Sequence, residues 1–166
     1  LQAFGGPGRT LLSFTPTYSM YPLLADGTDT GWVAVPRPAD YALTPEYVAA
    51  ALAEHKPDIA IICGPNNPTG TPLTRETILA AYEAFDGILI VDEAYHEFDD
   101  ENPTAVELLP GRHRLLVSRT MSKAFAFAGV RLGYLAADPA VIDALRLVRL
   151  PYHLSALTQA AATTAL

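Results

Sequence analysis

"DIAIICGPNNPTGTPLTRETILAAYEAFDGILIVDEAY", residues 58–95, is the stretch that decides the fold. Residues 58–63 are almost entirely apolar, which predicts a strand covered on both faces. A loop rich in Pro, Asn and Gly follows at 64–72, and residues 73–85 predict a helix that Thr74 caps. A second apolar strand, predicted over 87–95, carries acidic residues only at its carboxyl end. Strand, helix and strand in this order predict a parallel pair joined by a crossover helix.

The same alternation continues on both sides of this unit. Two further helices are predicted at 43–55 and 138–148, because each begins with a capping residue, Thr44 or Asp138, followed by proline at the first helical position. A turn is expected at 15–22, and four further strands are expected at 11–14, 32–35, 114–120 and 131–137. The pattern predicts an α/β fold, a three-layer sandwich with a mostly parallel sheet between helices.

Composition excludes several classes of function. The 166 residues carry a net charge of −7 and form no basic run, which argues against nucleic acid and anionic membranes as partners. No apolar run has the length of a membrane span, and no signal peptide is visible. The lone Cys63 suits a reducing cytoplasm, and its place after an apolar run indicates a buried core residue rather than a nucleophile.

Both ends of the sequence indicate interrupted helices. "LQAFGGPGR" at 1–9 is typical of the last turn of a helix and its glycine stop, and "LTQAAATTAL" at 157–166 is typical of an unfinished helix. We therefore expect residues 1–166 to be a single domain from a longer polypeptide.

Polar residues gather where the predicted strands end. In open α/β sheets, ligands bind beyond the carboxyl ends of the strands, and loops at this edge lie side by side. The loops after 58–63, 87–95 and 114–120 would bring together Asn67, Asp92, Tyr95, Thr120, Ser122, Lys123 and Arg131.

This set of side chains has a chemical logic. A lysine amine attacks carbonyl carbon when burial or a neighbouring cation lowers its pKa, and Arg131 is a candidate for that cation. The hydroxyls of Thr120 and Ser122 together with a guanidinium suit a phosphate. A carboxylate such as Asp92 can keep a heterocyclic nitrogen protonated. A lysine Schiff base, a phosphate site and an aspartate beside a pyridinium are what pyridoxal phosphate requires.

Three motifs in order carry a family resemblance: "NNPTG" (66–70), "VDEAYHEF" (91–98) and "SRTMSKAFAFAGVRLGY" (118–134). They resemble the fold-type-I pyridoxal-phosphate aminotransferases. "PTYSMYP" (16–22) and "RLPYHLS" (149–155) resemble the histidinol-phosphate branch of that family, in its actinobacterial form. The resemblance covers nearly the whole chain and implies that residues 1–166 are the large, cofactor-binding domain, without the small domain and the N-terminal segment.

The resemblance also implies a role for each residue. Lys123 would bind the cofactor covalently and move a proton between the substrate and the cofactor, Asp92 would pair with the ring nitrogen, and Tyr95 and Asn67 would bind the phenolic oxygen. These roles make Lys123, Asp92 and Tyr95 the predicted catalytic residues. Tyr18 would stack on the ring, and the phosphate would be held by Thr120, Ser122 and Arg131. Pro68 and Gly70 would shape the loop that aims Asn67.

Simpler interpretations stay open for single residues. Lys123 alone would suit the surface, Asn67 before Pro68 would suit a turn, and Tyr18 would suit a core. Glu93, beside Asp92, is expected to face the other way and to be structural. No histidine spacing predicts a metal site.

The leading hypothesis for function is transamination between histidinol phosphate and 2-oxoglutarate in histidine biosynthesis, by a cytoplasmic homodimer. Its partners would be a small amino donor and a 2-oxo acid acceptor. The same cofactor residues would serve an aromatic aminotransferase or a decarboxylase of a phosphorylated amino acid. A different class, an aminotransferase-like sensing domain of a transcription regulator, also stays open.

Overall fold

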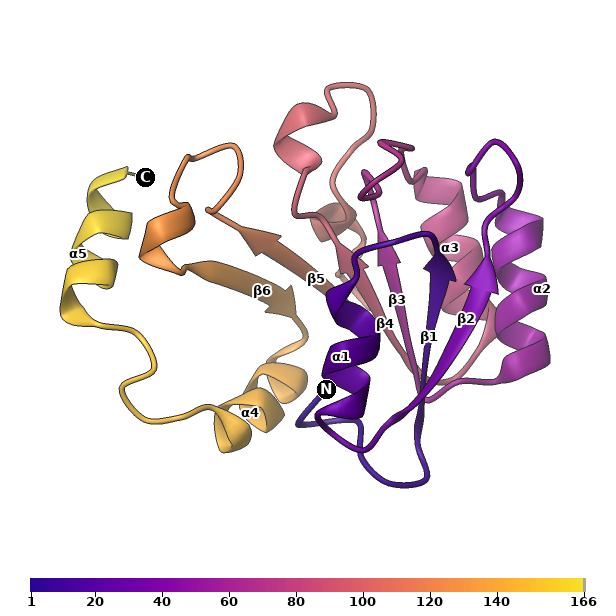
Figure 1. Ribbon diagram of the computed structural model, residues 1–166, viewed down its shortest axis with the longest axis horizontal. Coiled ribbons are helices and arrows are strands. Elements are labelled where there is room, and N and C mark those ends of the chain that lie inside the picture. The colour runs from indigo at the N-terminus through magenta and orange to yellow at the C-terminus, as the bar shows by residue number, and fades with distance from the viewer. Residues whose placement is uncertain (166) are drawn as a thin grey trace.

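The computed structural model describes residues 1–165, and Leu166, the last residue of the predicted C-terminal helix, lies outside the described residues. Its centre is a six-stranded sheet in the order β2-β1-β3-β4-β5-β6. Five strands run parallel and β6 is antiparallel to β5 (Figure 1). The strands are β1 (Thr10–Thr15), β2 (Gly31–Pro36), β3 (Ile59–Cys63), β4 (Ile88–Asp92), β5 (Leu115–Thr120) and β6 (Gly133–Ala137). The predicted α/β architecture is confirmed.

In the described part of the chain, five α-helices accompany the sheet, and all are short. They are α1 (Met20–Asp26), α2 (Pro45–His55), α3 (Arg75–Ala84), α4 (Pro139–Val148) and α5 (Ala156–Ala165). Three single 3₁₀ turns cover His96–Phe98, Ala105–Leu108 and Ala128–Val130. Within residues 1–165, none of these helices is long and apolar enough to cross a membrane.

The predicted helix caps are present. Thr44 accepts a hydrogen bond from the backbone N–H of Tyr47 at 3.2 Å, and Thr74 does the same for Thr77 at 3.2 Å. At α4, the Asp138 side chain accepts from the N–H of Ala140 at 2.9 Å. Each cap satisfies a backbone donor that the first helical turn leaves without an intrahelical partner, and so fixes where the helix begins.

Side chains alternate between the two faces of the sheet, because successive residues of a strand point to opposite sides. On one face, Leu12, Ile62, Leu89 and Val117 are buried in the larger core cluster, which includes Val48 of α2 and other residues of α2 and α3. The other face carries the smaller cluster, made of Leu11, Ile59 and Ile61 from the sheet with Tyr21 and Ala25 from α1. Figure 1 shows α1 crossing in front of the strands, away from α2 and α3.

The predicted turn at 15–22 is wrong in part, because residues from Met20 onward form helix α1. The helix was not predicted because Pro22 is typical of a turn. Pro22 lies in the first helical turn, where its missing N–H leaves no hydrogen bond unmade. Tyr21 and Ala25, four residues apart, lie on the face that packs against the sheet.

The predicted strand over 87–95 is too long at its carboxyl end. Strand β4 stops at Asp92, and Tyr95 lies directly before the 3₁₀ turn at 96–98. The strand that was expected at 131–137 is present as β6.

Candidate active site

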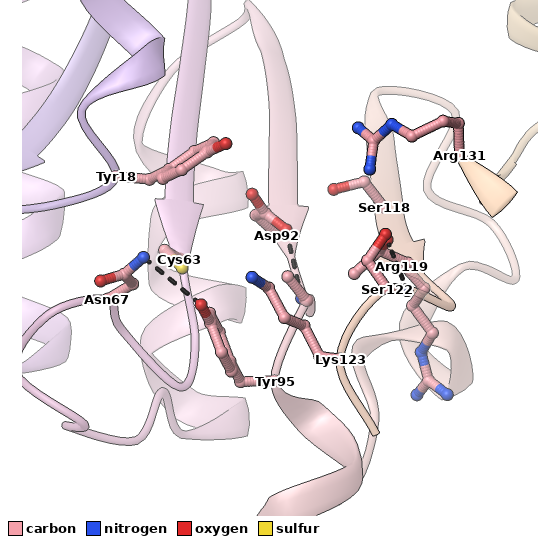
Figure 2. A pocket seen from close by; sticks show the side chains of 12 residues that line it. Tyr18, Cys63, Asn67, Asp92, Tyr95, Ser118, Arg119, Ser122, Lys123 and Arg131 are labelled. Carbon is pink, nitrogen blue, oxygen red and sulfur yellow. Dashed lines mark hydrogen bonds between the residues drawn. The ribbon is translucent and has the colours of Figure 1, made fainter. Parts of the chain in front are cut away.

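A cavity of about 300 Å³ opens at the carboxyl edge of the sheet, where strands β3, β4 and β5 end (Figure 2). All eight residues that the sequence predicted for the site line it, together with four others. The lining residues are Tyr18, Cys63, Asn67, Asp92, Ala94, Tyr95, Ser118, Arg119, Thr120, Ser122, Lys123 and Arg131. Parallel strands bring their following loops to one edge, which is why residues as far apart as Tyr18 and Arg131 meet here.

Asp92 is the last residue of β4, and both of its carboxylate oxygens are held. Oδ1 accepts a hydrogen bond from the backbone N–H of Ala94 at 3.2 Å. Oδ2 accepts one from the hydroxyl of Tyr21 at 2.7 Å. Hydrogen bonds to a carboxylate favour its charged form and fix its rotamer. The carboxylate therefore stands at the cavity as an oriented negative charge.

Asn67 and Tyr95 form a polar pair on one side of the cavity. The side-chain amide of Asn67 donates to the Tyr95 hydroxyl at 3.4 Å. The loop that carries Asn67 turns at Gly70, whose φ of +70° is a conformation that favours glycine. The backbone N–H of Gly70 closes this loop by donating to the carbonyl of Asn66 at 2.8 Å.

The two neighbouring asparagines of this loop differ in role. Asn66 is 3% exposed, and its side chain is fully used inside the protein. It accepts from the hydroxyl of Thr17 and donates to the carbonyl of Pro16 and to the hydroxyl of Thr69. These bonds connect the loop after β3 to the segment after β1. Asn66 therefore fixes the conformation of the loop from which Asn67 faces the cavity.

Lys123 lies in the loop after β5 and points into the cavity. Figure 2 shows its amine directed toward the space bordered by Asp92, Cys63 and Tyr95. The amine is 5.4 Å from the centre of the Tyr95 ring. The side chain is exposed in this chain, so the cavity is accessible to a ligand at the lysine.

The hydroxyls and the guanidinium expected to hold a phosphate lie on the β5 side. Thr120 uses its hydroxyl locally, accepting from the N–H of Ser122 at 3.1 Å and facing the carbonyl of Leu132 at 3.4 Å. Arg131 donates to the carbonyl of Ala128 at 2.9 Å and is otherwise exposed. Figure 2 shows its guanidinium beside Ser118 and away from the Lys123 amine, an arrangement that suits anion binding more than activation of the lysine.

Tyr18 forms the wall opposite the lysine (Figure 2). Its ring meets the ring of Tyr21 edge to face, with centroids 5.6 Å apart and planes at 85°. The ring of Tyr18 is 42% exposed, so a flat face is free for a ligand to stack on.

Cys63 and Ser118 also line the cavity, although the sequence did not single them out for the site. The strand register pairs Cys63 with Asp92 and Asp92 with Ser118, so the three residues lie level across β3, β4 and β5. A signal was present, because each lies at or near the end of its predicted strand. Cys63 is buried, as expected, and burial together with the charge of Asp92 raises the pKa of its thiol to about 11. A protonated thiol at neutral pH is a poor nucleophile.

Glu93 points to the other face of the sheet, as predicted. It is 2% exposed and accepts hydrogen bonds from the hydroxyl of Thr104, the N–H of Ala105 and the guanidinium of Arg119. Arg119 borders the cavity, but its charged group is engaged with Glu93 at 2.8 Å. The two adjacent carboxylates, Asp92 and Glu93, therefore have different surroundings, one at the cavity and one inside the fold.

Among residues 1–165 there is no group of three or more His, Cys, Asp or Glu side chains placed to bind a metal ion. The chemistry that the cavity offers is that of an amine, a carboxylate, a phenol with an amide, and an anion site built from hydroxyls and a guanidinium.

Comparison with known proteins gives one family. The model of the aminotransferases of class I and II matches residues 1–166. Histidinol-phosphate aminotransferases from Paenarthrobacter aurescens and Thermobifida fusca are 62% and 58% identical to this chain over its whole length. The chain spans 46% of each of these relatives, so it corresponds to less than half of their length.

Solved structures agree on the fold. Histidinol-phosphate aminotransferase from Sinorhizobium meliloti, in complex with pyridoxal-5'-phosphate, superposes with a TM-score of 0.86 at 27% identity, over 96% of this chain and 44% of that one. A decarboxylase from Sulfurospirillum multivorans superposes with a TM-score of 0.79 at 25% identity, over 92% of this chain and 46% of that one.

Proposed function

This chain belongs to the family of class I and II aminotransferases, and we propose from this that it is the cofactor-binding large domain of a pyridoxal-phosphate-dependent histidinol-phosphate aminotransferase. The reaction moves an amino group between histidinol phosphate and 2-oxoglutarate, as a step of histidine biosynthesis. The observation that carries the proposal is the meeting of Lys123, Asp92 and the Asn67–Tyr95 pair in one cavity at the sheet edge.

The residues of the cavity fit each functional group of pyridoxal phosphate. The Lys123 amine matches the aldehyde, and the Asp92 carboxylate matches the ring nitrogen. Tyr95 and the Asn67 amide supply hydrogen-bond donors for the phenolic oxygen, and the exposed ring of Tyr18 supplies a stacking surface. When bound, the cofactor supplies an electron sink for the carbon that carries the amino group.

Lys123 would hold the cofactor covalently through its amine, and that amine, once displaced by the amino substrate, would be the base that moves a proton to and from the substrate α-carbon. The carboxylate of Asp92 would keep the ring nitrogen protonated, which the electron sink requires. The Asn67–Tyr95 pair orients the ring through the oxygen next to the reacting carbon. Tyr95 also faces the lysine amine, at 5.4 Å from its ring centre.

The anion site lies on the β5 side of the cavity. Ser122 and Arg131 would bind the cofactor phosphate there, and Thr120 would contribute by holding the turn that carries Ser122. A guanidinium and hydroxyls are suited to a dianion, because charge-assisted hydrogen bonds are about twice as strong as neutral ones.

The choice of substrate rests on the relatives. Curated histidinol-phosphate aminotransferases are 55–62% identical over this chain, whereas the decarboxylase neighbour is 25% identical. The partners of the enzyme are accordingly a small amino donor and a 2-oxo acid.

The exposed positions of Tyr18, Lys123 and Arg131 suit a site that further protein covers, and we assign that role to a homodimer partner and to the rest of the enzyme. We place the enzyme in the cytoplasm, where Cys63, the one cysteine of residues 1–166, stays reduced.

The test uses the full-length protein incubated with pyridoxal phosphate and then reduced with borohydride, which fixes the phosphopyridoxyl group on the amine that held it. Peptide mass spectrometry is expected to find the group on Lys123. The matched control is Lys56, the only other lysine of the chain, which ends α2. Lys56→Arg should bind the cofactor as the wild type does, and Lys123→Ala should not be labelled.

Substrate choice is tested on the same protein by visible absorption. Histidinol phosphate should remove the band of the enzyme-bound aldehyde form, and 2-oxoglutarate should restore it. If histidinol phosphate leaves the band unchanged, and a phosphorylated amino acid added in its place is converted to its amine with release of carbon dioxide, the protein is a decarboxylase. A protein that never carries the phosphopyridoxyl group would refute the cofactor assignment. It would equally refute a sensing domain that binds this cofactor.

A further inference from the structure

Tyr21 does not line the cavity, but it contacts Asp92, which does. It lies on α1 and is 3% exposed, within the cluster that joins α1 to the sheet. Its hydroxyl donates to Oδ2 of Asp92 at 2.7 Å, across 71 positions of sequence. The ring is held by packing, because Leu11, Ile59 and Ile61 are buried in the same cluster. A hydroxyl on a ring fixed in this way gives the carboxylate a partner of constant position.

The hydrogen-bond direction is fixed by the surroundings of Tyr21. Burial, followed by the negative charge of Asp92, raises the pKa of the Tyr21 phenol well above its usual value. The phenol therefore keeps its proton at any working pH, and this proton is the one donated to Asp92. The other ionisable neighbours are Cys63 of β3 and Arg37, which follows β2. Cys63 has a pKa of about 11, and Arg37 is committed to the carbonyls of Phe14 and Tyr41.

We propose that Tyr21 is a positioning residue that keeps Asp92 ionised and aimed at the ring nitrogen of the cofactor. This inference rests on the proposed function. In the complex, one proton can reside on the ring nitrogen or on the carboxylate. A donor to the carboxylate stabilises its charged form, so the proton stays on the nitrogen. Without the hydroxyl, the only remaining donor to the Asp92 carboxylate within the described chain is the N–H of Ala94.

The bond also fixes geometry. Oδ1 and Oδ2 are each held by one donor, from the backbone of the next turn and from α1. These two bonds hold the carboxylate in a fixed orientation at the wall of the cavity. Loss of a hydrogen-bond partner of a metal ligand typically changes affinity or activity about 10-fold to 100-fold, and by analogy we expect the lower end of that range here.

The variant that isolates this role is Tyr21→Phe, which keeps the ring and removes the hydroxyl. The matched control is Tyr47→Phe. Tyr47 is also a tyrosine on a helix, its hydroxyl donates to the carbonyl of Pro36, and it lies on the opposite face of the sheet. Circular dichroism of both full-length variants establishes that they are folded.

The deciding measurement is nitrogen-15 NMR of the full-length protein loaded with pyridoxal phosphate that is labelled at the ring nitrogen. The wild type and Tyr47→Phe are expected to show a protonated ring nitrogen. In Tyr21→Phe the resonance should move toward the unprotonated value, as it should, further, in Asp92→Asn. We also expect kcat to fall about 10-fold in Tyr21→Phe with KM little changed, the pattern of a lost transition-state interaction.

Three results separate this inference from the proposed function. If Asp92→Asn moves the resonance and Tyr21→Phe leaves both the resonance and kcat as in the wild type, the hydroxyl is only a packing contact and the inference is refuted. If Tyr47→Phe has the same effect as Tyr21→Phe, the effect is one of general stability and the inference is again refuted. If the wild type binds no cofactor, the proposed function itself fails.

Discussion

Asp92 and Glu93 are adjacent in sequence, but we predict that they contribute to different properties. Glu93 should contribute mainly to stability, and Asp92 mainly to cofactor binding. Glu93 is 2% exposed and is surrounded by donors. It accepts from the hydroxyl of Thr104 at 2.8 Å, from the N–H of Ala105, and from Nε of Arg119 at 2.9 Å. A second guanidinium nitrogen of Arg119 lies 2.8 Å away in the ion pair. Glu93→Gln keeps the shape of the side chain and removes its charge, so it tests what the charge contributes.

The expected cost follows from what the variant leaves behind. Breaking a buried ion pair by removing one partner costs about 3–5 kcal/mol, because the other charge is left without compensation. Arg119 is only partly in that position. It is 16% exposed, it still donates to Thr104, and Glu97 lies 3.6 Å from its guanidinium. Since these contacts partly compensate the charge, we expect Glu93→Gln to lose about 2–3 kcal/mol of unfolding free energy.

The assay is urea unfolding of the full-length protein followed by circular dichroism, with Asp92→Asn as the comparison. A shift of the midpoint at constant slope reports a change in stability. Asp92 is half-buried and an asparagine there still accepts from Tyr21, so its variant should change stability by less than about 1 kcal/mol. Cofactor affinity should show the reverse order, with a large loss in Asp92→Asn and a small one in Glu93→Gln. Equal losses of stability in the two variants would contradict this assignment.

Two further predictions concern the end of β3. Gly64→Ala should cost about 1–3 kcal/mol of stability, because its Cβ would lie 2.2 Å from the Cβ of the buried Leu73; Gly129→Ala, with open space around it, is the control in the same urea assay. Since the Cys63 thiol titrates near 9.0 when exposed and near 11 when folded, the unfolded state loses its proton first as pH rises. Stability should therefore be constant below pH 9 on this account and fall by up to about 1.4 kcal/mol per pH unit between 9 and 11. Unfolding followed across this range should show a smaller fall in Cys63→Ala, and an identical fall would contradict the assignment.

Much of the site could be predicted from the sequence, because parallel strands deliver their loops to one edge. In the predicted strands at 58–63 and 87–95, residues 59–63 and 87–91 form uninterrupted apolar runs, so the polar residues had to gather at the strand ends. The strand order was not needed for this conclusion. What mattered was that β3, β4 and β5 run in the same direction.

The contact between Tyr21 and Asp92 could not be predicted, because it depends on how a helix docks. Pro22 concealed the helix, and no local pattern says which strand end a residue of α1 reaches. The span of 71 positions between the two residues leaves the contact to tertiary packing. The structure was needed to find that Tyr21 contacts Asp92.

The pair of Glu93 and Arg119 was, by contrast, within reach of the sequence. Side chains alternate along a strand, so residues 88, 90 and 92 share one face of β4, and residues 89, 91 and 93 share the other. Ile88 and Ile90 pack with α1, whereas Leu89 and Val91 belong to the core with α2 and α3.

The same rule applied to β5 places Ser118 with Asp92, and Arg119 with Glu93. At the carboxyl edge of this sheet, alternate residues therefore have different roles. Asp92 and Ser118 face the cavity, whereas the charged groups of Glu93 and Arg119, one residue further along each strand, pair inside the fold. A catalytic carboxylate and a structural one can then be neighbours in sequence without interfering, because the pleat of the strand holds them on opposite sides of the sheet.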